Sequence, residues 1–444
     1  MNVSPNISPF AQMGSIPQDF PRWLPELLGK LTGALNWNID WNQFGPLLLV
    51  LWGVIVFTLI AIVAQASVIF MVLMERKVLA WLTQRKGPNR VGPWGLLQTL
   101  ADGVKLLFKE DIIPAGASPI LFTLGPAIFF LPTFVFFGLI PFTDQLLAVA
   151  LPAGALFIFA ISSLSVVGLV LAGWASNNKY SLLGGMRSAA QAISYEIPLV
   201  MAVLGVVLFT GTMNIADIVK AQQGGFWNWY WLVLTPISLL IFFISSLAEV
   251  NRVPFDLPEA ESELVSGYNT EYTGMKFALF FLAEYAALFA MSALTVAFFF
   301  GGYYPPLPQF VVEMITGQQS ASMTGPLQLA LQCEMLFWFM MKTYLFIFLA
   351  MWVRATLPRL KPDQLMGFSW KFLIPLSLLN IFIIAIQKYL FIQSAQGQLL
   401  PILNGSTVMS WGISIVIAVV VFGSFFILMS RLLTEKLEAR LAQR

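Results

Sequence analysis

Six carboxylates lie close together in the chain, between Glu249 and Glu271, and the segments on either side are long and apolar. A single basic residue, Arg252, lies among them. A carboxylate at the edge of a membrane is unfavourable unless it is solvated, paired or protonated. Neighbouring acids raise one another's pKa, so some of them can hold a proton near neutral pH and pass it on. These residue types point to proton transfer, and the six acids are Glu249, Asp256, Glu259, Glu261, Glu263 and Glu271.

Two further carboxylates, Glu196 in ISYEIPLV and Glu284 in FFLAEYAALF, lie inside apolar segments. An acid within a membrane helix is rarely without function. Together with the acidic loop, these two predict a chain of carboxylates from the membrane surface toward the bilayer centre. If Asp256 begins a short helix, then Asp256, Glu259 and Glu263 share one helix face. The alternative for the loop is a solvated acidic segment that pairs with its single arginine.

The composition excludes several classes of protein. Of the 444 residues, 58% are hydrophobic and 10% are charged, whereas a soluble domain has about 25% charged residues. An integral membrane protein is therefore expected, and the net charge of +2 gives no sign of nucleic-acid binding. Because the chain has no histidine and only one cysteine, Cys333, no haem, zinc or iron–sulfur site and no Ser/His/Asp or Cys/His nucleophile is expected. Any electron carriers are expected in partner subunits.

Apolar segments long enough to cross a bilayer recur along the chain. They predict an all-α, polytopic integral membrane protein with about nine transmembrane helices and an amphipathic interfacial helix. The nine segments are Phe44–Met74, Pro119–Phe142, Leu146–Trp174, Ala189–Thr210, Trp231–Ala248, Met275–Phe300, Leu327–Val353, Lys371–Phe391 and Val408–Leu432.

Lysine and arginine are concentrated in alternate loops and in the C-terminal tail. The opposite side has only Arg22, Lys30 and Lys220 in its connecting segments. The positive-inside rule then predicts that the N-terminus lies outside and that the C-terminus and the acidic loop are cytoplasmic.

The amphipathic helix is expected between Trp94 and Lys109, where Leu96, Leu100 and Leu107 recur at helical spacing. One interpretation is a connector that anchors the loop. The other is a wall or gate for a lipophilic ligand that enters from the bilayer.

Two basic loops have alternative interpretations. In the first, Gly87-Pro88 and Gly92-Pro93 force an ordered turn. That turn suggests a docking surface for a cytoplasmic partner, although its charges also suit a topology signal that contacts anionic lipid. In the later loop, Arg354 and Arg359 either pair with the acidic loop or only mark the cytoplasmic side.

At these motifs the chain resembles the H subunit of bacterial NADH:quinone oxidoreductase, or respiratory complex I, whose mitochondrial counterpart is complex I subunit 1. The resemblance spans roughly residues 44 to 391. It rests on four stretches in the same order, Glu75–Glu110, Gly173–Glu196, Ala248–Tyr285 and Trp352–Lys371.

The resemblance implies a translocase component that is not catalytic alone and that joins the membrane arm to the peripheral quinone module. Its substrate is a quinone, ubiquinone or menaquinone, whereas NADH, FMN and iron–sulfur clusters belong to partner subunits. The implied location is the bacterial inner membrane. The implied proton-coupling residues are Glu196, Glu249, Asp256, Glu259, Glu261, Glu263, Glu271 and Glu284, and the implied quinone-chamber residues are Arg76, Asp102, Lys105, Arg252, Arg354 and Arg359.

Residues 44–391 are expected to form the membrane domain of this complex I family, with eight helices and with the acidic loop at 249–274. Residues 1–43 are then a non-cytoplasmic extension, and 392–444 hold an additional helix and a cytoplasmic tail. Two alternatives stay open, the related docking subunit of a membrane-bound hydrogenase and an ion-coupled secondary transporter.

Overall fold

The computed structural model describes residues 45–233, 236–258, 261–306, 326–395 and residue 423. The regular elements in these residues are all helices, and no strand occurs among them. Seven helices are long and apolar enough to cross a membrane, and a shorter apolar helix accompanies them. The chain is therefore a multi-pass membrane protein, as predicted. The ninth predicted segment, Val408–Leu432, and residues 1–43 lie outside the described residues.

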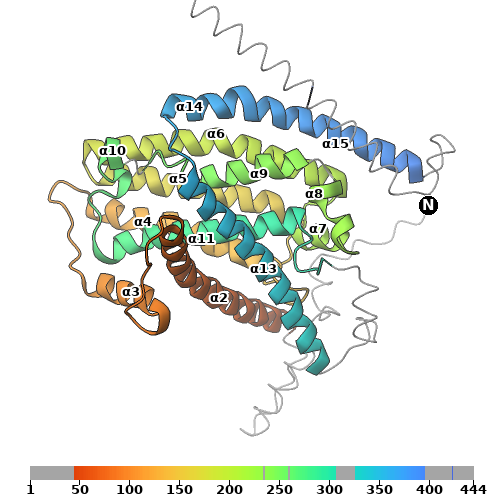
Figure 1. Ribbon diagram of the computed structural model, residues 1–444, viewed down its shortest axis with the longest axis horizontal. Coiled ribbons are helices and arrows are strands. Elements are labelled where there is room, and N and C mark those ends of the chain that lie inside the picture. The colour runs from red at the N-terminus through yellow and green to blue at the C-terminus, as the bar shows by residue number, and fades with distance from the viewer. Residues whose placement is uncertain (1–44, 234–235, 259–260, 307–325, 396–422, 424–444) are drawn as a thin grey trace, which may run out of the picture.

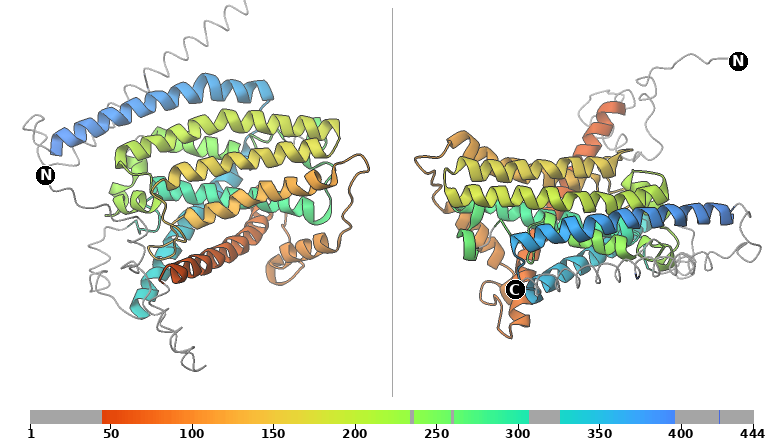
Figure 2. Two further views of the ribbon diagram at one scale, coloured as in Figure 1. Left: turned by 180° about the vertical axis from the view of Figure 1, so that it is seen from behind. Right: turned by 90° about the horizontal axis from the view of Figure 1, so that it is seen from above.

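Most of the spanning helices run in similar directions, while α2 and α13 cross them obliquely (Figure 1). Helix α5 packs between α4 and α6, and α15 lies at the edge of the bundle against α6 (Figure 2). The spanning helices are α2 (Gly45–Leu82), α4 (Pro119–Leu139), α5 (Gly154–Ala175), α6 (Lys179–Thr210), α11 (Gly274–Phe299), α13 (Pro326–Thr356) and the continuous run α14 (Pro362–Phe368), η7 (Ser369–Leu373, a π-helical turn) and α15 (Ile374–Ala395).

Shorter elements connect these helices. The apolar helix α9 follows α8, and α10 and η5 lie in the acidic loop. Among the described residues, the connecting elements are η3 (Pro93–Gly95), α3 (Gln98–Phe108), α7 (Ile215–Ala221), η4 (Phe226–Asn228), α8 (Tyr230–Val233), α9 (Pro236–Glu249), α10 (Glu261–Leu264) and η5 (Gly267–Asn269).

Two helices extend beyond their apolar segments. Helix α2 continues to Leu82, eight residues past the predicted end at Met74, because no helix breaker occurs before Gly87-Pro88. Helix α6 begins at Lys179, ten residues before the predicted start, because the Asn178 side chain accepts a hydrogen bond from the Tyr180 amide and caps the helix. Both extensions carry charged residues on rigid helices instead of loops.

Helix α11 lies at the centre of the bundle. In its most apolar stretch 67% of the residues are buried, compared with 33–50% in the other spans. Phe289 and Phe299 are fully buried and belong to the main apolar core. The polar residues Glu284, Ser292 and Thr295 of α11 are buried as well.

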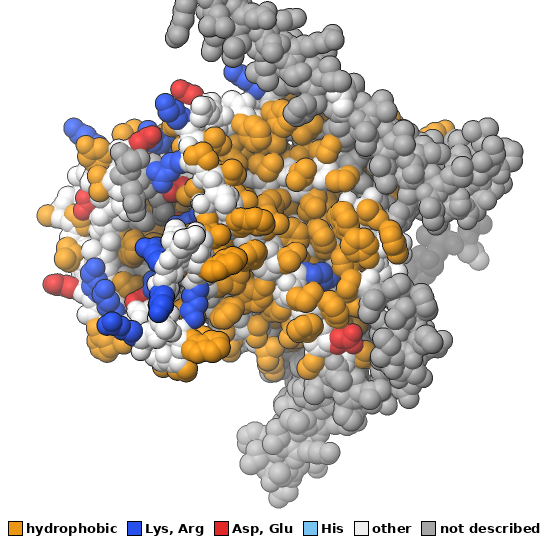
Figure 3. Space-filling view, in the orientation of Figure 1, with side chains coloured by type: hydrophobic (Ala, Val, Ile, Leu, Met, Phe, Trp, Pro, Cys, Tyr) orange, Lys and Arg blue, Asp and Glu red, His pale blue; other side chains and the backbone are white. Residues whose placement is uncertain are grey.

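Charged side chains gather at one end of the bundle on the face that Figure 3 shows, over α3, α10 and the beginning of α14, and the middle of this face is mostly apolar. Among the exposed apolar side chains on α2 are Leu59 and Ile62. This distribution is typical of a membrane bundle with one polar end.

Candidate functional site

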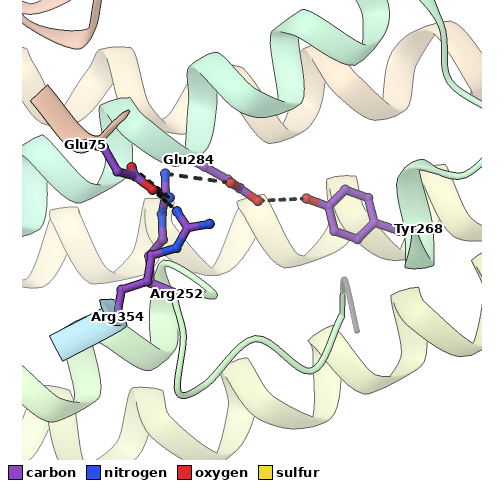
Figure 4. A network of polar contacts seen from close by, with 5 residues as sticks. All are labelled: Glu75, Arg252, Tyr268, Glu284 and Arg354. Atoms are coloured by element: carbon purple, nitrogen blue, oxygen red, sulfur yellow. Dashed lines mark hydrogen bonds and ion pairs between the residues drawn. The ribbon is translucent and has the colours of Figure 1, made fainter. Parts of the chain in front are cut away.

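Four charged residues from four elements meet at the polar end of the bundle (Figure 4). Glu75 comes from α2, Arg252 from the turn after α9, Glu284 from α11 and Arg354 from the last turn of α13. Arg252 Nη1 lies 3.3 Å from Glu75 Oε2, and its Nη2 lies 3.9 Å from Glu284 Oε2. Arg354 also pairs with Glu75. We call these four residues the arginine–glutamate cluster.

The centre of the cluster is shielded from solvent. The side chains of Arg252, Glu75 and Glu284 are 8%, 5% and 6% exposed. The Arg252 guanidinium carbon also lies 4.1 Å from the centre of the Tyr285 ring, a cation–π contact. Burial opposes the charge of Arg252, but Tyr285, Glu75 and Glu284 outweigh burial and raise its pKa above the ordinary value. Arg252 is therefore a permanent buried cation between two carboxylates.

Glu284 also accepts a hydrogen bond from the fully buried hydroxyl of Tyr268, at 3.1 Å (Figure 4). Tyr268 lies in η5, which packs directly on α6. A Cβ at Gly184 would lie 2.7 Å from the Tyr268 amide nitrogen, so glycine is needed for this close approach. Helix α6 thus places the acidic loop against α11.

A small cavity joins Glu249 to Glu284. Its volume is about 20 Å³, which is room for one water molecule, and Ser162 and Thr133 also line it. Glu249 Oε2 is buried and has no hydrogen-bond partner among the described residues. Glu249 is also close enough to Glu196, on α6, for the two carboxylates to repel each other electrostatically. Three predicted carboxylates are thus neighbours within the bundle.

The other described acids that the sequence predicted for proton coupling, Asp256, Glu263 and Glu271, pair individually along the rim of this site. We call these the rim pairs. Arg359 lies 2.7 Å from Asp256, and Arg187 lies 2.6 Å from Glu263. Asn178 Nδ2 donates to Glu271 Oε1 at 2.6 Å. Glu259 and the side chain of Glu261 lie outside what the structure describes.

Helix α3, predicted over residues 94–109, forms next to the end of α2. Arg76 pairs with Asp102 at 2.5 Å, and Gln98 donates to the same carboxylate. Lys77 donates to the Trp94 carbonyl oxygen. These contacts tie α3 to α2, whereas Lys105 is exposed.

Two arrangements that the sequence left open do not occur in the structure. Asp256 does not begin a helix that includes Glu263, because Pro258 disfavours a helical conformation at Leu257 and α10 begins only at Glu261. Asp256 and Glu263 also have separate arginine partners. Arg354 pairs with Glu75 and not with the acidic loop, whereas Arg359 pairs with that loop, which was one of its two interpretations.

Two residues of the site were not singled out for a role from the sequence. Glu75 lies where hydrophobicity falls and basic residues begin, so it was expected in a loop. Helix propensity that continues through Leu82 is the signal that would have assigned Glu75 to helix α2. Tyr268 carries no local signal, because only the packing of η5 on α6 directs it to Glu284. Among the described residues, no group of His, Cys, Asp and Glu has the arrangement of a metal site.

A family profile described as NADH dehydrogenase matches residues 54–385, about three quarters of the chain. The chain belongs to the NADH dehydrogenase family. This membership confirms the resemblance seen in the sequence. The arginine–glutamate cluster, the small cavity and α3 all lie within the matched residues.

Curated relatives extend this match. The chain is 48% identical over 336 residues to the H subunit of NADH-quinone oxidoreductase from Brevibacillus brevis, covering 76% of this chain and 93% of that protein. It is 46% identical over 340 residues to the Rickettsia typhi protein of the same name, with 77% and 94% coverage. For the Dehalococcoides mccartyi protein the identity is 46% over 321 residues, with 72% and 82% coverage.

Proposed function

We propose that the chain is the H subunit of a proton-translocating NADH:quinone oxidoreductase, part of the enzyme but not catalytic alone. The observation that carries the proposal is the arginine–glutamate cluster, a buried ionic network at one end of a membrane bundle of this family. The names of the chain's relatives favour this function over the two alternatives, a docking subunit of a hydrogenase and a secondary transporter.

In this proposal the quinone side of the site consists of α3 and the arginines. The exposed apolar residues of α3, among them Leu100 and Leu107, suit the isoprenoid tail of ubiquinone or menaquinone. Reduction of the quinone takes two electrons, from iron–sulfur clusters in partner subunits, and two protons. The residues proposed for the chamber are Arg76, Asp102, Lys105, Arg252, Arg354 and Arg359.

The proton side consists of the carboxylates. Uptake of protons by the reduced quinone changes the charge near Arg252, and Arg252 contacts both Glu75 and Glu284. A changed field at Glu284 then acts across the small cavity on Glu249, and from there on Glu196. The proposed proton-coupling residues are Glu196, Glu249, Asp256, Glu259, Glu261, Glu263, Glu271 and Glu284.

The proposal extends to topology and partners. The distribution of Lys and Arg supports an inner-membrane protein with an outside N-terminus and a cytoplasmic C-terminus and acidic loop. Residues 44–391 form the family's membrane domain, 1–43 a non-cytoplasmic extension, and 392–444 an additional helix and tail. The partners are peripheral quinone-module and membrane-arm subunits, which hold NADH, FMN and the iron–sulfur clusters, together with membrane lipid.

Carboxylate-to-amide substitution in the assembled complex tests the function. We expect Glu249→Gln to slow inhibitor-sensitive quinone reduction and proton pumping without loss of the protein from the complex, because the amide cannot exchange a proton. Glu263→Gln should slow both less, because its side chain is 46% exposed and already paired with Arg187. Glu334→Gln, on a membrane helix away from the site, is the matched control. Normal turnover and pumping in both test variants would remove the proton-coupling role.

A further inference from the structure

Gln191 is a fully buried polar residue of α6 whose amide faces three oxygen atoms. Its Nε2 lies 2.7 Å from the carbonyl oxygen of Ala248, 2.6 Å from that of Phe255 and 3.1 Å from Asn251 Oδ1. Because the two carbonyl oxygens can only accept hydrogen bonds, this position requires a donor. One side chain thus holds both ends of the segment from Ala248 to Phe255.

This segment contains two central residues of the site, Glu249 and Arg252. Beyond Glu249, where α9 ends, it is irregular backbone, and Asn251 has a left-handed conformation with φ of 54°. The hydrogen bonds within it are short-range turns, including Arg252 N to Leu247 O at 3.2 Å and Phe255 N to Arg252 O at 2.8 Å, and Pro254 O accepts one long-range bond from the Leu360 amide at 3.2 Å. A turn of this kind does not by itself fix the position of Arg252 relative to other helices.

Only a narrow range of positions lets Arg252 make its contacts. Arg252 must contact Glu75 on α2 and Glu284 on α11 at the same time. The two hydrogen bonds from Gln191 to the segment's backbone come from α6, a third helix. They therefore fix where the Arg252 backbone lies along the bundle axis and how it is rotated about that axis.

We propose that Gln191 is a positioning residue for proton coupling, which acts by holding Arg252 between Glu75 and Glu284. This inference rests on the proposed function of the chain. Gln191 does not touch the quinone or a reacting proton. Its role is to keep the buried cation aligned with both carboxylates while the charge beside them changes.

Two substitutions of similar length separate positioning from simple packing. Gln191→Met keeps the shape and removes the donor, and Gln191→Glu keeps the shape but has a donor only when protonated. Each is made in the complete complex, in membranes, with Ser188→Ala as the control. Ser188 lies one turn earlier in α6, is buried, and its hydroxyl has no hydrogen-bond partner among the described residues.

For Gln191→Met we expect kcat for quinone reduction to fall about tenfold, as for loss of one buried hydrogen-bonding group. The KM for a short-chain quinone should stay within about twofold, because no binding contact is removed. Gln191→Glu should regain activity as the pH is lowered from about 8 to about 6, since the protonated carboxyl again donates to the segment.

The Gln191→Met variant also controls for other titrating groups, which it shares with Gln191→Glu. A pH response in the glutamate variant alone therefore reports the new carboxyl. The charged or titratable groups on this part of α6, and on the elements packed against it, include Arg187, Tyr195, Glu196, Glu249, Arg252, Asp256, Glu263, Tyr268, Arg359, Asp363 and Lys371.

The proposal fails if Gln191→Met turns over like the wild type, or if both variants lose activity with no pH response in Gln191→Glu. It also fails if neither variant assembles with the partner subunits, because Gln191 would then support the fold itself. A wild-type complex without inhibitor-sensitive quinone reduction would contradict the proposed function instead, so the two failures are distinguishable.

Discussion

The arginine–glutamate cluster and the rim pair of Arg187 with Glu263 use the same types of side chain in different environments. In the cluster, the side chains of Arg252, Glu75 and Glu284 are at most 8% exposed. In the rim pair of Arg187 and Glu263, the side chains are 31% and 46% exposed. The rim distance, 2.6 Å, is shorter than the 3.3 Å and 3.9 Å contacts of Arg252. Distance alone would rank the rim pair as the stronger contact.

The loss of stability on removing one partner follows the opposite order, because the cluster is buried and the rim pair is exposed. An exposed pair is weakened by solvent and salt, and contributes about 0–1 kcal/mol. Removing one partner of a buried pair leaves an uncompensated charge and costs about 3–5 kcal/mol. A charge change next to the cluster is therefore transmitted to its neighbours, whereas the same change at the rim is largely screened.

The largest effect is expected for Arg252→Met. It leaves Glu75 and Glu284 without the buried cation between them, so the protein should lose about 3–5 kcal/mol of stability. Thermal unfolding of the purified complex and the amount of assembled protein measure the loss. Adding Glu284→Gln should restore part of it, because one unpaired charge is removed. Equal destabilisation in the single and double variants would mean that the two residues are not coupled.

An intermediate effect is expected for Arg359→Ala. Its partner Asp256 has a side chain that is 12% exposed, between the cluster and the other rim pairs. Loss of this charge-assisted hydrogen bond should destabilise the acidic loop by about 1.5–3 kcal/mol. Proteolytic susceptibility of the loop in the intact complex is a suitable measurement. If the loop resists proteolysis as well as it does in the wild type, then this pair contributes as little as an exposed rim pair.

The smallest effect is expected for Arg187→Ala, which removes the exposed partner of Glu263. Stability should change by less than about 1 kcal/mol. The difference from the wild type should also shrink as salt is raised, because the Debye length falls to about 8 Å at 0.15 M ionic strength. A salt-independent loss comparable to that of Arg252→Met would contradict the distinction between cluster and rim.

Part of the site was predictable from local sequence. Glu284 was expected to be functional because an acid within an apolar helix is rarely without a role, and the structure places it in the cluster. For Arg359 the sequence left open pairing with the acidic loop or a topology signal, and in the structure it pairs with Asp256. The positions of both residues could be predicted because hydrophobicity and charge within one segment decide whether a residue lies in the membrane or at its edge, whereas the functional role of Glu284 stays a prediction.

The pairing of the charges was not predictable to the same extent. Arg354 was expected to contact the acidic loop or to mark topology, yet it pairs with Glu75, 279 positions away in the chain. Asp256 and Glu263 would share a helix face if Asp256 began a helix, but it does not, and the two acids have separate arginine partners. The choice of partner depends on which helices pack together, and that information is spread over the whole chain.

The sequence by itself determined that the chain is a helical membrane protein, since hydropathy is a property of composition, and the absence of histidine predicts that redox metals belong to partner subunits. It also determined the family, through motifs that are continuous in the chain. Only the tertiary structure decided that Glu75, Arg252, Glu284 and Arg354 form one cluster. The physical reason is that four separate elements must converge before a buried guanidinium can contact carboxylates from two other helices, and no local pattern encodes that convergence.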